Sequence, residues 1–191
     1  MTDRPLPTFE ALWTFACLDT PDFLTDRQES AIRALHEGEV NWKKLTSDLV
    51  GPALPKVFEA WRAVIRRSDK INYHEYARAL AQSWTRTHYP MYDLSYAVWL
   101  EAFRDVGFRI NGRVADRPAE PMTVFRGGWS WVGMSWTPSR SVAEWFANEN
   151  GGKVWECEAQ PEAILAVFDN SVKGEVEYVI DPTELVSIFE S

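Results

Sequence analysis

The spacing of apolar residues changes once along the chain, near residue 108, and this change limits the possible folds more than any other feature. In residues 1–107 apolar side chains recur every three or four positions, which predicts amphipathic helices. In residues 108–191 short apolar runs lie between turn-forming residues, which predicts strands. We expect a single domain of α+β class over residues 1–191, with a helical part (1–107) and a β-rich part (108–191).

The pattern also predicts where each element lies. Helices are expected at 7–18, 25–38, 40–50, 53–69, 72–87, 91–108 and 138–150, and strands at 122–128, 133–137, 153–159, 163–169, 175–181 and 185–189. Thr25 and Gln28 have the spacing of a capping box, and Gly38 suits the position after that helix ends. Residues 109–121, rich in Arg, Gly and Pro, are predicted to form a loop. We expect the strands between residues 122 and 189 to form a mixed, mostly antiparallel sheet.

Composition excludes several classes of function. The formal charge of −8 and pI of about 5.0 argue against a broad electrostatic grip on nucleic acid or an anionic membrane. No stretch reaches the roughly 20 apolar residues of a membrane span, and the N-terminus lacks a secretory pattern. Cys17 and Cys157 are isolated, which predicts buried thiols in a reducing compartment. We therefore expect a cytoplasmic protein.

No metal or nucleotide-binding motif of a common type is present. The three histidines, His36, His74 and His88, lack the spacing of a metal site, so no metal is expected. The sequence has neither a GxGxxG nor a Walker-type loop. The basic stretch at 61–70 is interpreted as a solvated helix end, with a patch that faces a target or a ligand as the alternative.

Two glutamates stand out in the segment GEVEYVID. On a strand, Glu175 and Glu177 share one face about 7 Å apart, while the apolar residues between them face the other way. Such a pair decorates the solvated face of an edge strand or lines a polar cleft, and the pair alone does not decide between them.

Two other segments hold polar residues that suit a ligand. Arg126 follows a β-like run and precedes Gly127, so a guanidinium lies beside backbone that a ligand can approach; the alternative is a surface arginine before a turn. Ser135 and Thr137 share one face of a short strand. Thr137 or Ser139 is alternatively only a helix cap.

Taken in order, VFRGG, then GMSWTPSRSVAEWFA, then GEVEYVIDPTEL resembles the R-S-E class of mono-ADP-ribosyltransferases, the cholera-toxin-like class. The resemblance covers about residues 122–190. It implies a split β-sheet of ADP-ribosyltransferase type and NAD as a substrate. Residues 1–107 match no named subgroup.

The resemblance also implies roles. Arg126 would hold NAD phosphates, the backbone of Gly127 would meet the nicotinamide carboxamide, and Ser135 would orient the catalytic Glu177. Thr137 takes the place of a serine that is commoner in the class. Glu175 would meet the incoming nucleophile, and a glutamate there favours arginine as the acceptor. Residues 168–174 would form the turn that recognises the acceptor.

Several alternatives stay open at this stage. An aromatic ring would pack on nicotinamide, and the candidates are Trp129, Trp131, Trp136, Trp145 and Phe146, although Trp145 and Phe146 have core-like helical spacing. Phe146 is included among the expected NAD contacts. The acceptor is a macromolecule, with protein favoured and nucleic acid open. The chain could instead hydrolyse NAD, or bind a partner through a degenerate site without catalysis. A toxin, a bacterial or phage effector and a defence protein all fit.

Overall fold

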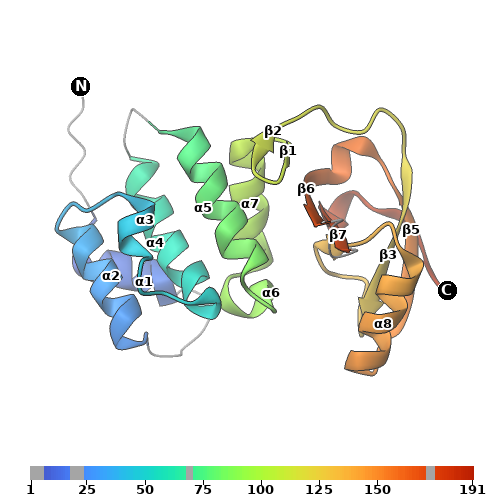
Figure 1. Cartoon of the computed structure of the whole chain (residues 1–191), viewed down its shortest axis with the longest axis horizontal. Helices are drawn as coiled ribbons and strands as arrows, with labels where there is room; N and C mark the ends of the chain where they lie inside the picture. Colours follow the sequence, from blue (N-terminus) through green and yellow to red (C-terminus); the bar gives the residue numbers. More distant parts are fainter. Residues whose placement is uncertain (1–6, 18–23, 68–70, 171–174) are drawn as a thin grey trace. The chain divides into compact units, whose positions relative to one another are not determined.

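A computed structural model of the chain describes residues 7–17, 24–67, 71–170 and 175–191 (Figure 1). About 49% is helix and 23% is strand, with helices before strands, which confirms the predicted α+β class. The chain divides into two compact units, Met1–Trp99 and Leu100–Ser191, here called the helical unit and the strand-bearing unit.

The helical unit follows the predicted order. Its elements are α1 (Phe9–Cys17), α2 (Asp26–His36), α3 (Trp42–Leu45), the short 3-10 helix η1 (Gly51–Ala53), α4 (Leu54–Ile65), α5 (Tyr73–Thr85), α6 (Pro90–Asp93) and the start of α7 (Tyr96–Val106). The capping box of α2 is confirmed: the backbone N–H of Thr25 donates to Gln28 Oε1 at 2.8 Å, and the backbone N–H of Gln28 donates to Thr25 Oγ1 at 3.3 Å.

Two helix predictions in this unit are wrong in length. The segment at 40–50 forms only the single turn of α3, capped by the side chain of Asn41. The expected helix at 91–108 is interrupted between α6 and α7, because Leu94 adopts extended backbone angles (φ −138°, ψ 146°). The indole N–H of Trp99 donates to the carbonyl of Pro90 at 2.9 Å, which ties the second helix to the first turn of α6.

Aromatic rings form the core of the helical unit. The fully buried rings include Trp42, Phe58, Trp61, Tyr76 and Trp99, with neighbouring centroids 5.4–6.3 Å apart. Helix α4 is buried on nearly every side, so it is less amphipathic than its sequence pattern indicates.

Burial of α4 takes three charged side chains into the core, Lys56, Glu59 and Arg62, and two of them form an ion pair. Arg62 Nε lies 2.7 Å from a carboxylate oxygen of Glu59, and both side chains are buried. Removing one partner of such a pair leaves a buried charge without compensation, which is strongly destabilising. Arg62 is therefore part of the core, whereas Arg66 and Arg67 of the same basic stretch are exposed. Lys70 lies outside the described residues.

The strand-bearing unit contains two sheets. Its elements are β1 (Arg109–Ile110), β2 (Arg113–Val114), β3 (Met122–Gly128), β4 (Ser135–Trp136), α8 (Arg140–Asn150), β5 (Lys153–Ala159), η2 (Pro161–Ala163), β6 (Ile164–Asn170), β7 (Glu175–Ile180), η4 (Pro182–Glu184) and β8 (Val186–Glu190). One sheet has the order β2-β1-β6-β7-β4 and is mixed, because β1 pairs with β6 in parallel. The other, β3-β5-β8, is antiparallel.

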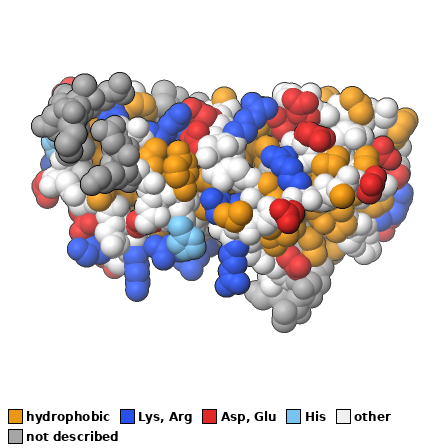
Figure 2. All heavy atoms as spheres, turned by 90° about the horizontal axis from the view of Figure 1, so that it is seen from above, with side chains coloured by type: hydrophobic (Ala, Val, Ile, Leu, Met, Phe, Trp, Pro, Cys, Tyr) orange, Lys and Arg blue, Asp and Glu red, His pale blue; other side chains and the backbone are white. Residues whose placement is uncertain are grey.

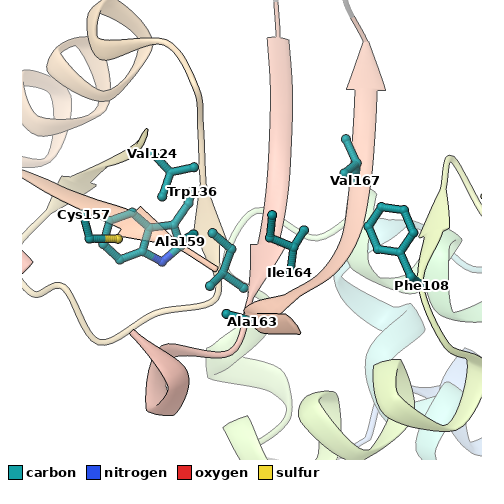
Figure 3. Packing of buried hydrophobic residues seen from close by; sticks show 9 residues of the cluster. Phe108, Val124, Trp136, Cys157, Ala159, Ala163, Ile164 and Val167 are labelled. Atoms are coloured by element: carbon teal, nitrogen blue, oxygen red, sulfur yellow. The ribbon is translucent and has the colours of Figure 1, made fainter. Parts of the chain in front are cut away.

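A shared core joins the two sheets. Val124 of β3 and Cys157 of β5 belong to the same buried cluster as Trp136, Ile164 and Ile180 of the larger sheet (Figure 3). Phe125 and Thr137 also form an isolated bridge, with backbone hydrogen bonds of 2.7 and 2.8 Å. Strands β3 and β4 are therefore held side by side although they belong to different sheets.

The predicted loop at 109–121 contains a small hairpin that the sequence interpretation missed. Strands β1 and β2 pair in antiparallel fashion around Asn111 and Gly112, whose φ angles are 49° and 74°. An Asn-Gly pair favours this left-handed backbone, so the dipeptide was the available signal. The remaining strands and α8 lie within a few residues of their predicted ranges.

Candidate functional site

Strand β7 carries its two glutamates on the face opposite the core. Val176, Tyr178 and Ile180 pack with the buried cluster, so Glu175 and Glu177 point to the other side. Glu177 is half-buried and Glu175 is exposed. The strand lies between β6 and β4 and is not a full edge strand. However, β4 pairs with it only at Tyr178 and Val179, so the half that bears the glutamates extends past β4.

The register places one of the two hydroxyl residues, Ser135, beside this carboxylate face. Ser135 pairs with Val179, and side chains of directly paired residues lie on the same face of a sheet. Because Glu177 shares the face of Val179, Ser135 lies on the carboxylate side. Thr137 lies beyond this pairing and bridges Phe125 of β3. The structure thus brings Ser135 and Glu177 to one face of the sheet.

The side chain of Arg126, which belongs to β3 of the other sheet, lies near Ser135 and Glu177. Its Nη1 donates to the carbonyl of Ser135 at 2.8 Å, and its Nε donates to the carbonyl of Ser130 at 3.1 Å. Nη2 has no hydrogen-bond acceptor among the described residues. Burial lowers the pKa of Arg126 from its ordinary value, while the nearby Glu177 carboxylate acts in the opposite direction. Arginine nevertheless remains a cation.

Gly133 gives the guanidinium its position, and the sequence interpretation did not identify this residue. A Cβ added to Gly133 would lie 2.4 Å from Arg126 Cζ and 2.5 Å from Nη2, so the guanidinium lies directly against the glycine backbone. The buried indole of Trp136 donates to the carbonyl of Gly133 at 2.8 Å. Residues 130–135 therefore form a cradle for Arg126. The glycine in GMSWT was the only sequence signal for it.

Gly127 has a packing function in the structure. A Cβ at this position would lie 2.0 Å from the carbonyl oxygen of Ala143 and 2.9 Å from Phe146 Cβ. Helix α8 therefore lies directly on the backbone of β3, with Ala143 and Ala147 buried against the strands. A contact between Gly127 and a nicotinamide carboxamide stays a prediction.

The capping interpretation holds for one of the two residues named for it. Ser139 is the N-cap of α8, and its Oγ accepts from the backbone N–H of Val142 at 3.4 Å. Thr137 is buried, and its hydroxyl accepts the backbone N–H of Ser139 at 3.2 Å. Thr137 therefore shapes the entry to α8, and its contact with NAD stays a prediction.

The five aromatic candidates divide by exposure. Trp136 is part of the core, and Trp131 is half-buried against it, so neither ring is well placed to pack on a ligand. Trp129, Trp145 and Phe146 are exposed, which contradicts the core interpretation of the two α8 residues. The reason is that Ala143 and Ala147 fill the contact between α8 and the strands, so the two rings lie at its margin.

Three further predictions concern the acceptor turn, a metal site and a membrane span. The acceptor turn at 168–174 is described only to residue 170; the other residues lie outside the described part. Within the described residues no group of three or more His, Cys, Asp and Glu side chains could hold a metal ion. None of the described helices is long and apolar enough to cross a membrane.

Comparisons with known proteins identify no relative. The sequence matches no family model, and neither the curated proteins nor the solved structures contain a match. A functional assignment therefore has to rest on the residues and geometry of the site itself.

Proposed function

We propose that this protein is a mono-ADP-ribosyltransferase that transfers ADP-ribose from NAD to a macromolecular acceptor and releases nicotinamide. One observation carries the proposal: Arg126, Ser135 and Glu177, which come from three separate strands, meet at one place in the strand-bearing unit. The proposal includes a split β-sheet of ADP-ribosyltransferase type, which the pairing of β3 with the end of β4 supports.

The donor set suits NAD as a substrate. The Nη2 of Arg126 can donate to a pyrophosphate oxygen while Nε and Nη1 remain bound to backbone carbonyls. Those two bonds hold the guanidinium plane before a ligand arrives, which reduces the entropy lost on binding. Phe146, whose Cβ lies beside Gly127 and whose side chain is partly exposed, would offer a ring for the nicotinamide.

Glu177 would supply the electrostatic part of catalysis. Cleavage of the bond between nicotinamide and ribose leaves positive charge on the ribose, and nicotinamide departs with the bonding electron pair. A carboxylate already in place stabilises that charge without reorganisation during the reaction. The hydroxyl of Ser135, on the same face, is suited to orient the carboxylate.

Glu175 would act on the acceptor. It is exposed, lies on the same face two residues earlier, and is therefore accessible to a macromolecule outside the NAD site. As a general base it would take the proton that the acceptor loses when its nitrogen or oxygen bonds to ribose C1′. The balance is one NAD and one acceptor giving ADP-ribosyl acceptor, nicotinamide and a proton.

The test uses the full chain with NAD labelled in the adenylate group and a bacterial cytosolic extract. The parent should transfer label to a macromolecule and release an equal amount of nicotinamide, while Glu177→Gln should lose both by about 10²–10³-fold. Glu158→Gln, an exposed glutamate of β5, is the matched control and should behave like the parent. Nicotinamide release without labelled macromolecule would identify an NAD glycohydrolase. Absence of both products in the parent would refute NAD chemistry.

A further inference from the structure

Four exposed residues at the C-terminal end of α8 form a surface that packing does not explain. Trp129, Trp145 and Phe146 expose 78%, 57% and 45% of their area, and Glu149 lies one helical turn after Trp145. We call these four residues the aromatic-acidic surface. Grouped exposed rings are unusual for a soluble domain and mark interaction sites.

Three of the four residues lie on successive turns of α8, and Trp129, which follows β3, lies beside the residue that ends this helix. The rings of Trp145 and Phe146 are edge to face, with centroids 4.8 Å apart. Trp129 Cζ2 lies 3.5 Å from where a Cβ on Gly151 would be, so this ring covers the residue that ends α8. Phe146 Cβ also lies beside Gly127, on the face of β3 that α8 covers. Arg126 precedes Gly127 on this strand and points to the other face, so the surface and the guanidinium lie on opposite faces of β3.

The charge of the surroundings indicates what kind of partner fits. The strand-bearing unit has fifteen acidic and eight basic residues, a formal charge of −7 out of −8 for the chain. From residue 141 onward there are eleven acidic residues and only two basic ones. Acidic and apolar side chains also lie next to one another on the face shown in Figure 2, which is not the face that bears α8 in Figure 1.

We propose that the aromatic-acidic surface docks a cationic segment of the protein that accepts ADP-ribose; this inference rests on the proposed function. Tryptophan faces attract guanidinium and ammonium groups, and arginine stacks on aromatic rings particularly well. Glu149 adds a carboxylate beside the Trp145 ring. The field of the unit attracts a basic chain and repels phosphate backbones and anionic lipids.

A second copy of this chain is a poorer occupant. Each copy would bring its own charge of −7 to the contact, so self-association through this surface meets repulsion. A cationic segment instead neutralises the negative charge of the surface. The surface would thus select acceptors by charge before chemistry occurs.

The experiment measures binding of a short fluorescein-labelled peptide of alternating arginine and serine by fluorescence anisotropy. Trp145→Ala should weaken binding about two- to fivefold, as expected for loss of one exposed cation–π contact. Glu149→Lys should weaken it by a similar factor, and the double variant by about tenfold if the two sites are independent. Added salt should weaken parent binding.

Glu120→Lys is the matched control for charge. Glu120 is exposed in the strand-bearing unit and precedes the opposite end of β3, about 20 Å away along a seven-residue strand. Glu120→Lys changes the net charge by the same amount as Glu149→Lys, but residue 120 lies away from the aromatic-acidic surface. Binding to the control should therefore stay within about twofold of the parent.

Three results would overturn the inference. One is equal weakening by Glu149→Lys and Glu120→Lys, which would mean that net charge alone attracts the peptide. Another is tighter binding of a labelled oligodeoxythymidylate than of the basic peptide. A third is a parent that sediments as a dimer and a Trp145→Ala variant that sediments as a monomer, which would assign the surface to a second copy.

Nicotinamide release, measured without peptide, separates this inference from the proposed function. If the parent releases nicotinamide but the surface variants bind the peptide like the parent, only the docking inference fails. If the variants lose peptide binding but the parent releases no nicotinamide, the docking surface stands as a binding site and the proposed enzyme activity fails.

Discussion

Substitution of Gly133 by alanine tests whether the cradle at 130–135 positions Arg126. The added Cβ would lie 2.4 Å from Cζ, whereas carbon atoms in ordinary contact are about 3.5–4 Å apart, so the guanidinium has to move by about 1 Å or more. Such a shift breaks or strongly lengthens the hydrogen bonds of 2.8 and 3.1 Å to Ser135 and Ser130.

The magnitude follows from two opposing effects. Hydrogen bonds to a charged group contribute about 1.5–3 kcal/mol each, and water replaces part of the loss at a half-buried site. Gly133 is not among the glycines with positive φ, so alanine costs no backbone strain and gains about 0.4–1 kcal/mol through the unfolded chain. We expect a net loss of about 1–2 kcal/mol in the free energy of unfolding, measured by urea titration.

A double-mutant cycle identifies the route of the effect. Arg126→Lys removes the planar guanidinium that Gly133 accommodates, so Gly133→Ala should do little further harm in that background. The same non-additivity should appear in nicotinamide release, with the loss in Gly133→Ala mainly as a raised KM for NAD. Full additivity of the two substitutions would refute the reasoning, because Gly133 would then act independently of Arg126.

Three further predictions concern separate parts of the chain. Glu177→Gln should lower nicotinamide release by about 10²–10³-fold, whereas Glu175→Gln should reduce transfer more than release; equal losses would contradict their separate roles. Burial, and to a smaller extent the nearby Glu156 carboxylate, raises the pKa of the Cys157 thiol to about 11. In a Cys17→Ser background, Cys157 should therefore resist alkylation at about pH 9 until the chain unfolds. Ionisation of this thiol should lower the free energy of unfolding only as the pH rises from about 9 toward 11. Thr25→Ala should destabilise the helical unit by about 1 kcal/mol through loss of its capping box, a change that urea titration measures.

The sequence predicted most of the helices and strands, because the signals that specify them act between residues close together in the chain. The capping box at Thr25 and the change of apolar period near residue 108 both depend on neighbours in the chain, and the structure contains both features. The break at Leu94 has no glycine or proline at the break itself; Leu94 is buried there, and Ser95, a residue type preferred at helix N-caps, directly precedes α7. The extent of burial of α4 was likewise hidden, because Glu59 and Arg62 look like surface residues until they pair.

In the candidate site too, local patterns place some residues and not others. Period-two alternation was enough to place Glu175 and Glu177 on one face, and the structure keeps them there. The cradle around Arg126 depends on contacts between segments that no local pattern encodes, so Gly133 was overlooked. Exposure of Trp145 and Phe146 follows from the close approach of α8 to Gly127, which only small residues allow.

The central claim is that Arg126, Ser135 and Glu177 form a site that cleaves NAD. Its most direct test is the rate of nicotinamide release from NAD by the purified full chain, compared with Glu177→Gln and the Glu158→Gln control. The account predicts release by the parent and the control, and a loss of about 10²–10³-fold in Glu177→Gln. Equal release by all three proteins, or none from the parent, would contradict it.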